Sequence, residues 1–244
     1  MRAESSNEFT RREFLKQTTF GLATAGVAGW VLRANAIPTA ASKNIEISEQ
    51  VLQQIGEPPQ PILMQDNLAP TKKSQLGPFY RAGAPFRAKV TPPFEPGTVL
   101  IVSGRVWAYD TKKPLSGAML DVWHVDHHGE YSSGKHDDKD GFKNRARLIT
   151  SESGYYEFEA IHPIAYQPGP NFWRSPHIHY KITHPGYKAL ITELFFEGDA
   201  KHDIDPLFQS ALMTKVAKQQ ASGQIYETAV FDIVLQPGSG AQGG

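Results

Sequence analysis

The feature that most constrains the fold is a series of β-rich segments that starts at residue 98 and has little helical pattern between its members. The segments are rich in Val, Ile, Tyr and Phe, and turn residues separate most of them. They are Thr98–Tyr109, Ala118–Asp126, Tyr155–Ile161, His177–Thr183, Ala189–Phe196 and Glu227–Leu235. Several successive strands with few helices predict a mainly β fold, an antiparallel β-sandwich or barrel.

Composition divides the chain into four parts. With 244 residues, it is long enough for one sizeable domain or at most two small ones. We expect a signal peptide over residues 1–36, an N-terminal lead-in and ordered wrap over 37–97, a β-sandwich core over 98–236 and a flexible glycine-rich tail over 237–244.

Two short helices are expected outside the strands. Ile47, Val51 and Ile55 recur at i, i+4 and i+8, which predicts a helix over Ile45–Ile55. A second helix is expected near the C-terminus, over Pro206–Gln220.

The first 36 residues have the pattern of an export signal. Arg11 and Arg12 form a twin-arginine motif, a mildly apolar stretch follows over Thr18–Leu32, and Ala34–Ala36 is an A-x-A cleavage site. The alternative is a membrane anchor, but the apolar stretch is about 15 residues long and a spanning helix needs roughly 20. We therefore expect twin-arginine export to the periplasm or outside the cell, with no stable membrane anchor after processing.

Charge and cysteine content exclude several classes of protein. The formal net charge is zero and the lysines and arginines form no basic stripe, so a nucleic-acid partner is not expected. Cysteine is absent, which excludes disulfides, thiolate zinc sites, cysteine-ligated iron–sulfur clusters and attached c-type haem. A metal in this protein must therefore be held by His, Tyr, Asp, Glu or backbone oxygens.

The segment Arg174–His179 places an arginine three residues before a His-x-His pair, in a run that reads as a strand. Side chains alternate between the faces of a strand, so His177 and His179 project from the same side. Two imidazoles at that separation can hold one ion of Zn, Cu, Fe or Ni. The alternative is an ordinary pair of half-buried strand histidines.

Two tyrosines in turn-rich contexts precede this pair, and the combination resembles the intradiol ring-cleavage dioxygenases, the family of catechol and protocatechuate dioxygenases. Tyr131 lies in a Gly-x-Tyr after a Trp-containing strand, and Tyr166 follows a Gly-Tyr-Tyr-x-Phe strand and a proline. The resemblance runs from Gly77 to about Leu235. It implies an antiparallel sandwich of this family's type, with long loops and few short helices, that carries its metal at one end.

The resemblance also implies a site and a reaction. One Fe(III) per chain would be held by Tyr131, Tyr166, His177 and His179, with no separate cofactor-binding residues. Tyr166 would leave the iron and accept a substrate proton, while Arg174 would stabilise negative charge on the substrate. The reaction implied is cleavage of a catechol-type aromatic (catechol, protocatechuate or a relative) by O2 to a cis,cis-muconate-type diacid.

Each of these residues has an ordinary alternative. A single tyrosine in a loop usually packs on a neighbour, and Arg174 could be a surface charge. Tyr155 and Tyr156 are rival ligands, although their strand position favours packing. Glu193 is a departure, because the family often has a glutamine there as a donor near the substrate. A glutamate donates only when protonated, and this leaves the choice of substrate open.

A second polar cluster contains His124, His127, His128 and His136, with Asp137 and Asp138 after them. It is either a second metal site or a solvated loop at the mouth of the main site, and we favour the loop. Two other functions are also possible for the whole chain. One is a non-catalytic sandwich that binds a sugar or a partner, and the other is a zinc hydrolase built on the His-x-His pair. The sequence is compatible with a homo-oligomer.

Overall fold

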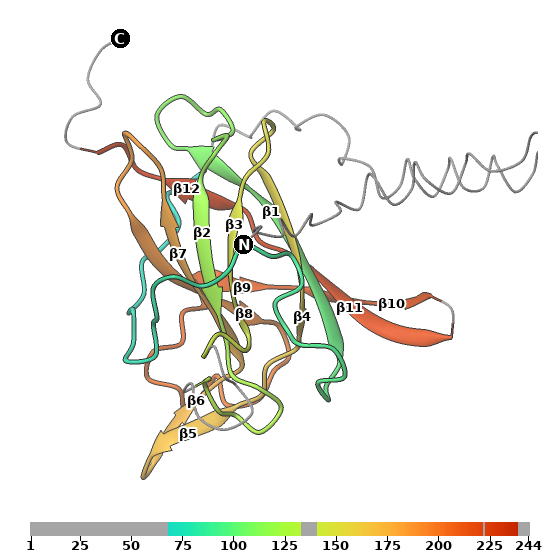
Figure 1. Ribbon diagram of the computed structural model, residues 1–244. Coiled ribbons are helices and arrows are strands. Elements are labelled where there is room, and N and C mark those ends of the chain that lie inside the picture. Colours follow the sequence, from blue (N-terminus) through green and yellow to red (C-terminus); the bar gives the residue numbers. More distant parts are fainter. Residues whose placement is uncertain (1–67, 133–140, 222, 239–244) are drawn as a thin grey trace, which may run out of the picture. The chain divides into compact units, whose positions relative to one another are not determined.

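The computed structural model describes residues 68–132, 141–221 and 223–238 (Figure 1). The chain divides into two compact units, residues 1–51 and 52–244, and all the described residues belong to the second. The expected signal peptide, the expected helix Ile45–Ile55 and residues 239–244 of the tail lie outside the described residues.

The described part of the chain is built almost entirely from strands, which confirms the mainly β prediction. A single turn of 3-10 helix, η1 at Ser210–Leu212, is the one helical element in these ranges. The strands are β1 (Val99–Ala108), β2 (Met119–Trp123), β3 (Arg145–Ile149), β4 (Tyr155–Ile161), β5 (Tyr166–Gly169), β6 (Phe172–Arg174), β7 (His177–Thr183), β8 (Leu190–Phe196), β9 (Met213–Thr214), β10 (Val216–Ala221), β11 (Gln224–Val230) and β12 (Ile233–Leu235).

The strands form two five-stranded sheets and one separate hairpin. The first sheet has the order β10-β11-β1-β12, and β4 also pairs with β1. The second has the order β3-β2-β7-β8-β9. The hairpin β5-β6 projects from one end of the sheets (Figure 1). This arrangement is the expected sandwich, with additional backbone at the end where the candidate site lies.

The core lies between the two sheets. Leu100, Val102 and Val106 alternate along β1 and are fully buried, as the period of a strand requires. Tyr180 of β7 meets Phe158 of β4 with ring centroids 6.2 Å apart, so the two sheets contact each other through aromatic side chains. Burial of each such side chain contributes about 1.5–3 kcal/mol to folding. The core therefore holds β7 rigidly at the base of the site.

The sheets are mixed, although six of the nine strand pairs are antiparallel. The pairs β1–β11, β1–β12 and β8–β9 are parallel. The single C-terminal strand expected over Glu227–Leu235 is interrupted at Phe231, whose N–H donates to the carbonyl of Ser103. A Cβ at Gly104 would overlap the carbonyl oxygen of Phe231, so glycine is required where the chain crosses β1.

The helix expected over Pro206–Gln220 is wrong. The segment contains the 3-10 turn η1, the short strand β9 and most of β10, which pairs with β11 in an antiparallel hairpin. Five of the six β10 residues are exposed, so the strand lacks the apolar alternation that sequence patterns detect. Among the described residues, no helix has the length and apolar character needed to cross a bilayer.

A histidine between two carboxylates links the end of β4 to β11 of the same sheet and to the segment that follows β8 of the second sheet. His162, just after β4, contacts Glu227 of β11 through Nδ1 at 2.6 Å and Asp199, which follows β8, through Nε2 at 2.9 Å. Burial disfavours the imidazolium, but Asp199 and Glu227 outweigh it and raise the pKa of His162. A raised pKa in the folded state means that the charged histidine stabilises the fold.

We expect His162→Gln to destabilise the protein more at pH 6 than at pH 9. The stabilisation is complete below the unfolded pKa of about 6.5 and is lost as pH rises through the raised folded pKa. At pH 6 the loss should be about 1.5–3 kcal/mol, the value of a charge-assisted hydrogen bond. Urea unfolding of both proteins at the two pH values measures it. His184→Gln is the control, because the hydrogen bonds of His184 go to backbone carbonyls and its ring packs on Tyr187, so no carboxylate is involved. An equal loss at both pH values would contradict the assignment.

Candidate metal centre

Four side-chain donor atoms converge at one end of the second sheet. The Tyr131 hydroxyl lies 3.2 Å from the Tyr166 hydroxyl, 3.0 Å from Nε2 of His179 and 3.4 Å from Nε2 of His177. The two Nε2 atoms are 3.2 Å apart. Metal–imidazole bonds of about 2.0–2.1 Å at tetrahedral angles would separate donor atoms by about 3.3 Å. The structure thus brings together all four residues that the sequence singled out as ligands, at spacings suited to one ion.

The histidine pair owes its position to the register of the second sheet. His179 lies directly opposite Trp123 of β2 on one side and Glu193 of β8 on the other. The indole of Trp123 stacks on the imidazole of His179 with centroids 4.8 Å apart and planes 7° apart. His177 is fixed by a 2.6 Å contact from Nδ1 to the carbonyl of Ser175. Both rings are therefore oriented with Nε2 toward the tyrosines.

The hairpin β5-β6 positions Tyr166. It begins the strand β5 and is paired with Arg174, the last residue of β6. Only two residues lie between that arginine and His177, so one short hairpin delivers a tyrosine and the arginine to the same end of β7. The stretch between Tyr166 and Arg174 is thus a two-stranded hairpin with Asn171 in the left-handed region at its turn (φ 57°).

A tight turn after β2 positions Tyr131. The backbone N–H groups of His128 and Glu130 donate to Oδ1 of Asp126. Gly129 has a φ of 81°, and a Cβ there would lie only 2.9 Å from Cβ of Tyr166, so a side chain at this turn is strained and crowds the site. The Gly-x-Tyr pattern therefore has a physical reason.

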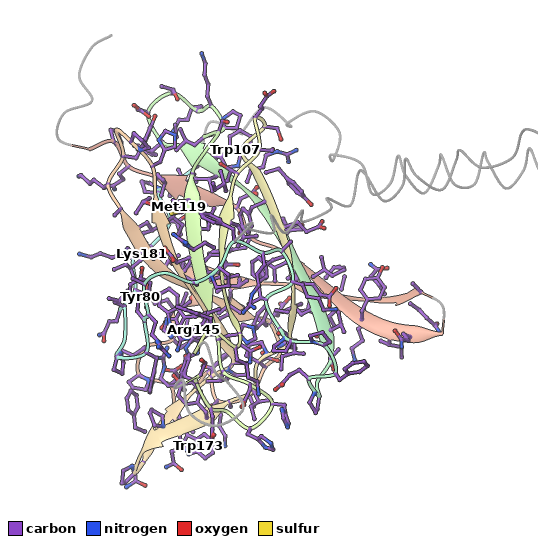
Figure 2. All side chains as sticks on the ribbon, viewed as in Figure 1. Tyr80, Trp107, Met119, Arg145, Trp173 and Lys181 are labelled. Carbon is purple, nitrogen blue, oxygen red and sulfur yellow. The ribbon has the colours of Figure 1, made fainter. Side chains whose placement is uncertain are left out.

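An arginine that sequence reasoning missed holds the Tyr131 side of the site. Arg145 of β3 is buried and donates to the backbone carbonyls of Phe79 and Ser132 at 2.6 and 3.2 Å. The ring of Phe79 stacks on Tyr131 with centroids 4.3 Å apart. Figure 2 shows Arg145 in the lower half of the sandwich, above the hairpin that carries Trp173. Strand β3 was not predicted, because its sequence, RARLI, is only weakly apolar.

The protonation states of the four residues match a site for a cation. Burial lowers the pKa of His177 to about 3 and holds that of His179 well below its usual value, so both imidazoles are neutral and can donate lone pairs. Burial also raises the pKa of Tyr131 and of Tyr166, so both phenols stay protonated unless a nearby positive charge compensates. A bound metal ion supplies that charge and reverses the effect of burial on its ligands. Two phenolate oxygens are hard anionic donors, and this set fits Fe(III).

Arg174 is a buried residue and not a surface charge. Its Nε donates to both carboxylate oxygens of Asp205 at 3.1 and 3.2 Å, and its Nη2 donates to Glu193 at 2.9 Å. Burial opposes its charge, but Glu193 and Asp205 raise its pKa and keep it protonated. Asp205 also accepts from the N–H and the hydroxyl of Ser175 at 2.8 Å. Sequence reasoning missed Asp205, which lies in a turn without any local motif.

Glu193 lies beside the histidine pair. His177, His179 and Glu193 form a group of two histidines and one carboxylate that could hold a metal ion. However, the Glu193 carboxylate is 3.3 Å from Nδ1 of His179 and 3.9 Å from Nε2 of His177. Its nearest histidine atom is therefore Nδ1 of His179, whereas the Tyr131 hydroxyl lies 3.0 Å from Nε2 of the same ring.

The two rival tyrosines pack elsewhere. Tyr155 donates to Glu157 at 2.6 Å, and Tyr156 is buried with its hydroxyl donating to the carbonyl of Phe231 at 2.6 Å. Both lie on β4, in the first sheet. Neither takes part in the cluster of donor atoms, as their strand position led us to expect.

The second polar cluster already contains a cation of the protein. Glu95, Asp126 and His127 lie within reach of one another, but Nζ of Lys143 sits 3.0 Å from Glu95 and 3.2 Å from Asp126. His124 is buried, with Nδ1 2.7 Å from the carbonyl of Val125. His136, Asp137 and Asp138 lie outside the described residues.

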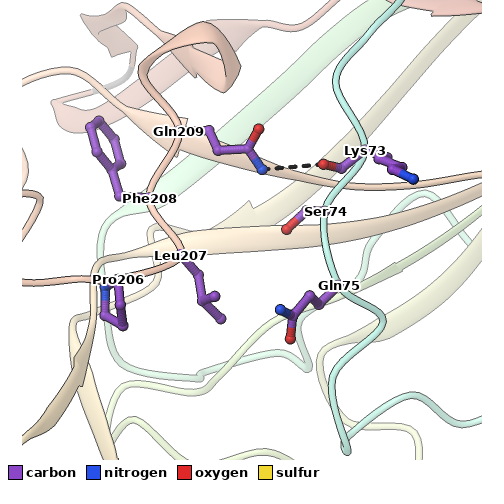
Figure 3. Close-up of a pocket in the computed structure, with 7 residues that line it drawn as sticks. All are labelled: Lys73, Ser74, Gln75, Pro206, Leu207, Phe208 and Gln209. Atoms are coloured by element: carbon purple, nitrogen blue, oxygen red, sulfur yellow. Dashed lines mark hydrogen bonds between the residues drawn. The ribbon is translucent and has the colours of Figure 1, made fainter.

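A pocket of about 410 Å³ lies beside the segment that follows Asp205 (Figure 3). It is lined by Lys73–Gln75 on one side and Pro206–Gln209 on the other, and Nε2 of Gln209 donates across it to the carbonyl of Lys73. Ser74 of this lining donates to Glu193 at 2.9 Å. A single hydrogen bond thus links the pocket to the carboxylate beside His179.

Comparisons with known proteins agree with this geometry. The family model described as Dioxygenase matches residues 76–237. A chlorocatechol 1,2-dioxygenase from Rhodococcus opacus is 35% identical over 188 residues, which cover 68% of this chain and 72% of that protein. Catechol 1,2-dioxygenase 2 from Acinetobacter lwoffii is 33% identical over 147 residues, 53% of this chain and 52% of that protein. The chain thus spans only about half the length of some relatives.

Solved structures show the same relationship. The dioxygenase domain of a dioxygenase carbohydrate-binding protein fusion from Streptomyces sp. SirexAA-E has a TM-score of 0.56 and 32% identity, covering 70% of this chain and all of that one. The 3-chlorocatechol 1,2-dioxygenase from Rhodococcus opacus 1CP has a TM-score of 0.62 and 25% identity, covering 68% of this chain and 72% of that one.

Proposed function

The chain belongs to the family of intradiol ring-cleavage dioxygenases, and from that premise we propose that it uses one Fe(III) to cleave a catechol-type aromatic with O2 to a cis,cis-muconate-type diacid. The observation that carries the proposal is that the Tyr131 hydroxyl lies within 3.0–3.4 Å of the Tyr166 hydroxyl and of both Nε2 atoms, which are themselves 3.2 Å apart. Both atoms of O2 enter the product, so the reaction needs no external reductant.

Tyr131, Tyr166, His177 and His179 would hold the iron. The two neutral imidazoles add no charge, and two phenolates with one hydroxide would balance the +3 of the ion. When bound, ferric iron would draw electron density from the catechol and make a ring carbon reactive toward O2.

The protein groups perform the remaining work. Tyr166 sits on a projecting hairpin rather than in the sandwich, so it is the tyrosine better able to move away and accept a substrate proton. Tyr131 is stacked on Phe79 and held through Arg145, so it stays in place. Arg174 brings a permanent positive charge to the site, and its planar guanidinium suits an anionic substrate oxygen.

The relatives narrow the substrate class. Several are named as dioxygenases of catechol, chlorocatechol, hydroxyquinol or 6-chlorohydroxyquinol, and one is named only as an intradiol ring-cleavage dioxygenase. These rings carry neighbouring hydroxyls and no carboxylate. We therefore infer that this chain acts on an uncharged catechol or hydroxyquinol rather than on protocatechuate.

The zinc hydrolase is the second candidate, and the grouping of His177, His179 and Glu193 is the observation in its favour. Two points weigh against it. Glu193 faces Nδ1 of His179 rather than Nε2, and Arg174 and Ser74 already occupy its oxygens. The non-catalytic binding module has no observation of its own.

The test combines metal analysis with product identification. Purified protein should contain one iron per chain, show a visible tyrosinate-to-iron absorption band, and convert catechol and O2 to cis,cis-muconate. Zinc at full occupancy in active protein, or a yellow hydroxymuconic semialdehyde as the product, would overturn the proposal. The semialdehyde is decisive because cleavage beside the diol belongs to ferrous enzymes with two histidines and one carboxylate.

A further inference from the structure

Glu193 is completely buried beside the candidate metal centre, although a carboxylate is among the most costly groups to bury. Burial raises its pKa, while Arg174 and Ser74 act in the opposite direction. The sequence led us to expect that a glutamate here would bear on the choice of substrate. Its contacts point instead to a role on the metal itself.

The side chain has two fixed anchors. Its Oε1 accepts from Nη2 of Arg174 at 2.9 Å, and its Oε2 accepts from the hydroxyl of Ser74 at 2.9 Å. Ser74 lies in the segment that runs along β8, where its N–H donates to the carbonyl of Ile191. The carboxylate therefore cannot swing toward the tyrosines without losing both partners.

The same carboxylate meets His179 across the strand pair β7–β8, where the two residues lie directly opposite each other. Oε1 is 3.3 Å from Nδ1 of His179, and that buried nitrogen has no hydrogen bond in the structure. Trp123 covers one face of the ring. His179 thus has Nε2 directed at the tyrosines and Nδ1 next to a carboxylate.

On the basis of the proposed function, we propose that Glu193 is a positioning residue of the iron site, which accepts the Nδ1–H of His179 and passes negative charge to the metal through that ring. A carboxylate behind a metal-bound histidine fixes its tautomer and makes it a more basic ligand. Arg174, Glu193 and Asp205 together carry a formal charge of −1, so Arg174 does not cancel this effect.

The consequence is a metal centre that favours the ferric state. A more basic His179 would bind iron more tightly and lower the Lewis acidity of the iron. The tyrosinate-to-iron band would then lie at higher energy, and the Fe(III)/Fe(II) reduction potential would be lower. An amide at the same position keeps an acceptor oxygen for Nδ1–H but carries no charge. Glu193→Gln therefore separates the charge of the residue from its shape.

The experiment compares iron-loaded wild-type protein with Glu193→Gln in three measurements without substrate. We expect the visible band to move to longer wavelength, the Fe(III)/Fe(II) potential to become more positive, and the iron affinity, measured by competition with a chelator, to fall about 10- to 100-fold. Glu193→Leu removes the acceptor as well and should lose more iron than Glu193→Gln.

Two controls show whether His179 transmits the effect. Asp205→Asn removes the same charge from the same arginine but does not touch His179, so its band should shift less than that of Glu193→Gln. Glu197→Gln, an exposed position just after β8, should not shift it. Equal shifts in Asp205→Asn and Glu193→Gln, or none in Glu193→Gln, would overturn the proposal while leaving the dioxygenase assignment intact. A wild-type protein without an iron band would refute the assignment first.

Discussion

Replacing His177 with alanine is expected to remove iron and turnover together. His177 is buried, its Nδ1 is held by the carbonyl of Ser175, and its Nε2 lies 3.2 Å from Nε2 of His179 and 3.4 Å from the Tyr131 hydroxyl. Loss of a partner behind a ligand costs about 10- to 100-fold in metal affinity, so loss of a ligand itself should cost more than 100-fold. Iron content per chain, measured after dialysis against a chelator, and the visible band report the result.

Tyr131→Phe tests whether the visible absorption band depends on the phenol oxygen of Tyr131 rather than on its ring. It removes one phenol oxygen and keeps the ring that stacks on Phe79, so the fold should be unchanged while the band moves or weakens. His184→Gln is the matched control for the histidine change, because His184 contacts the carbonyls of Pro185 and Ser116 and the ring of Tyr187 rather than the donor atoms of the site. Full iron occupancy in His177→Ala would show that the metal is held elsewhere.

The sequence was sufficient where local pattern alone determines position. His177 and His179 share a face because a strand has a period of two, and β7 occupies the range predicted for it. The same holds for β4, over Tyr155–Ile161. For Tyr131 and Tyr166, the local context identified residues that lie 35 positions apart and meet within 3.2 Å. Here the resemblance to a family predicted that these two distant residues meet, which the periodicity of the sequence does not predict.

The sequence was insufficient where the structure of a segment, or the role of a residue, depends on a partner strand or on a residue far away in the chain. A helix was expected over Pro206–Gln220, yet β10 forms there by pairing with β11 while five of its six residues remain exposed. The parallel pairs of β1 depend on a long chain return, which no local pattern reports. The same reason hides Asp205 and Ser74, whose roles exist only through contacts with Arg174 and Glu193.

Arg174 illustrates how the structure changes an experiment. Loss of positive charge near the substrate is only part of what Arg174→Leu would change. The structure shows Glu193 and Asp205 bound to this guanidinium in a buried place. Leucine would leave two buried carboxylates without a cation, and breaking a buried pair in this way costs about 3–5 kcal/mol. The Leu variant is therefore expected to be less stable as well as less active.

Arg174→Lys is the sharper test, because it keeps the charge and removes the planar fork. A single ammonium cannot reproduce the paired geometry toward Asp205 and Glu193 while also facing an anionic substrate. We expect the Lys variant to stay folded and to keep its iron and its visible band. Its kcat for catechol should fall about 10²- to 10³-fold, the usual loss when one preorganised donor is removed from a reaction site.

Thermal unfolding, iron content and steady-state kinetics on the same preparations separate the two roles of Arg174. A Lys variant with wild-type unfolding temperature, full iron and a large loss of kcat assigns the guanidinium to the reaction. A Lys variant with full turnover would remove Arg174 from the reaction and leave it as the counter-charge of Glu193 and Asp205. Glu193 and Asp205 already pair with the charge of Arg174, so its attraction for the free substrate is weak and its fixed orientation matters more. We therefore expect Arg174→Lys to lower kcat more than it raises KM.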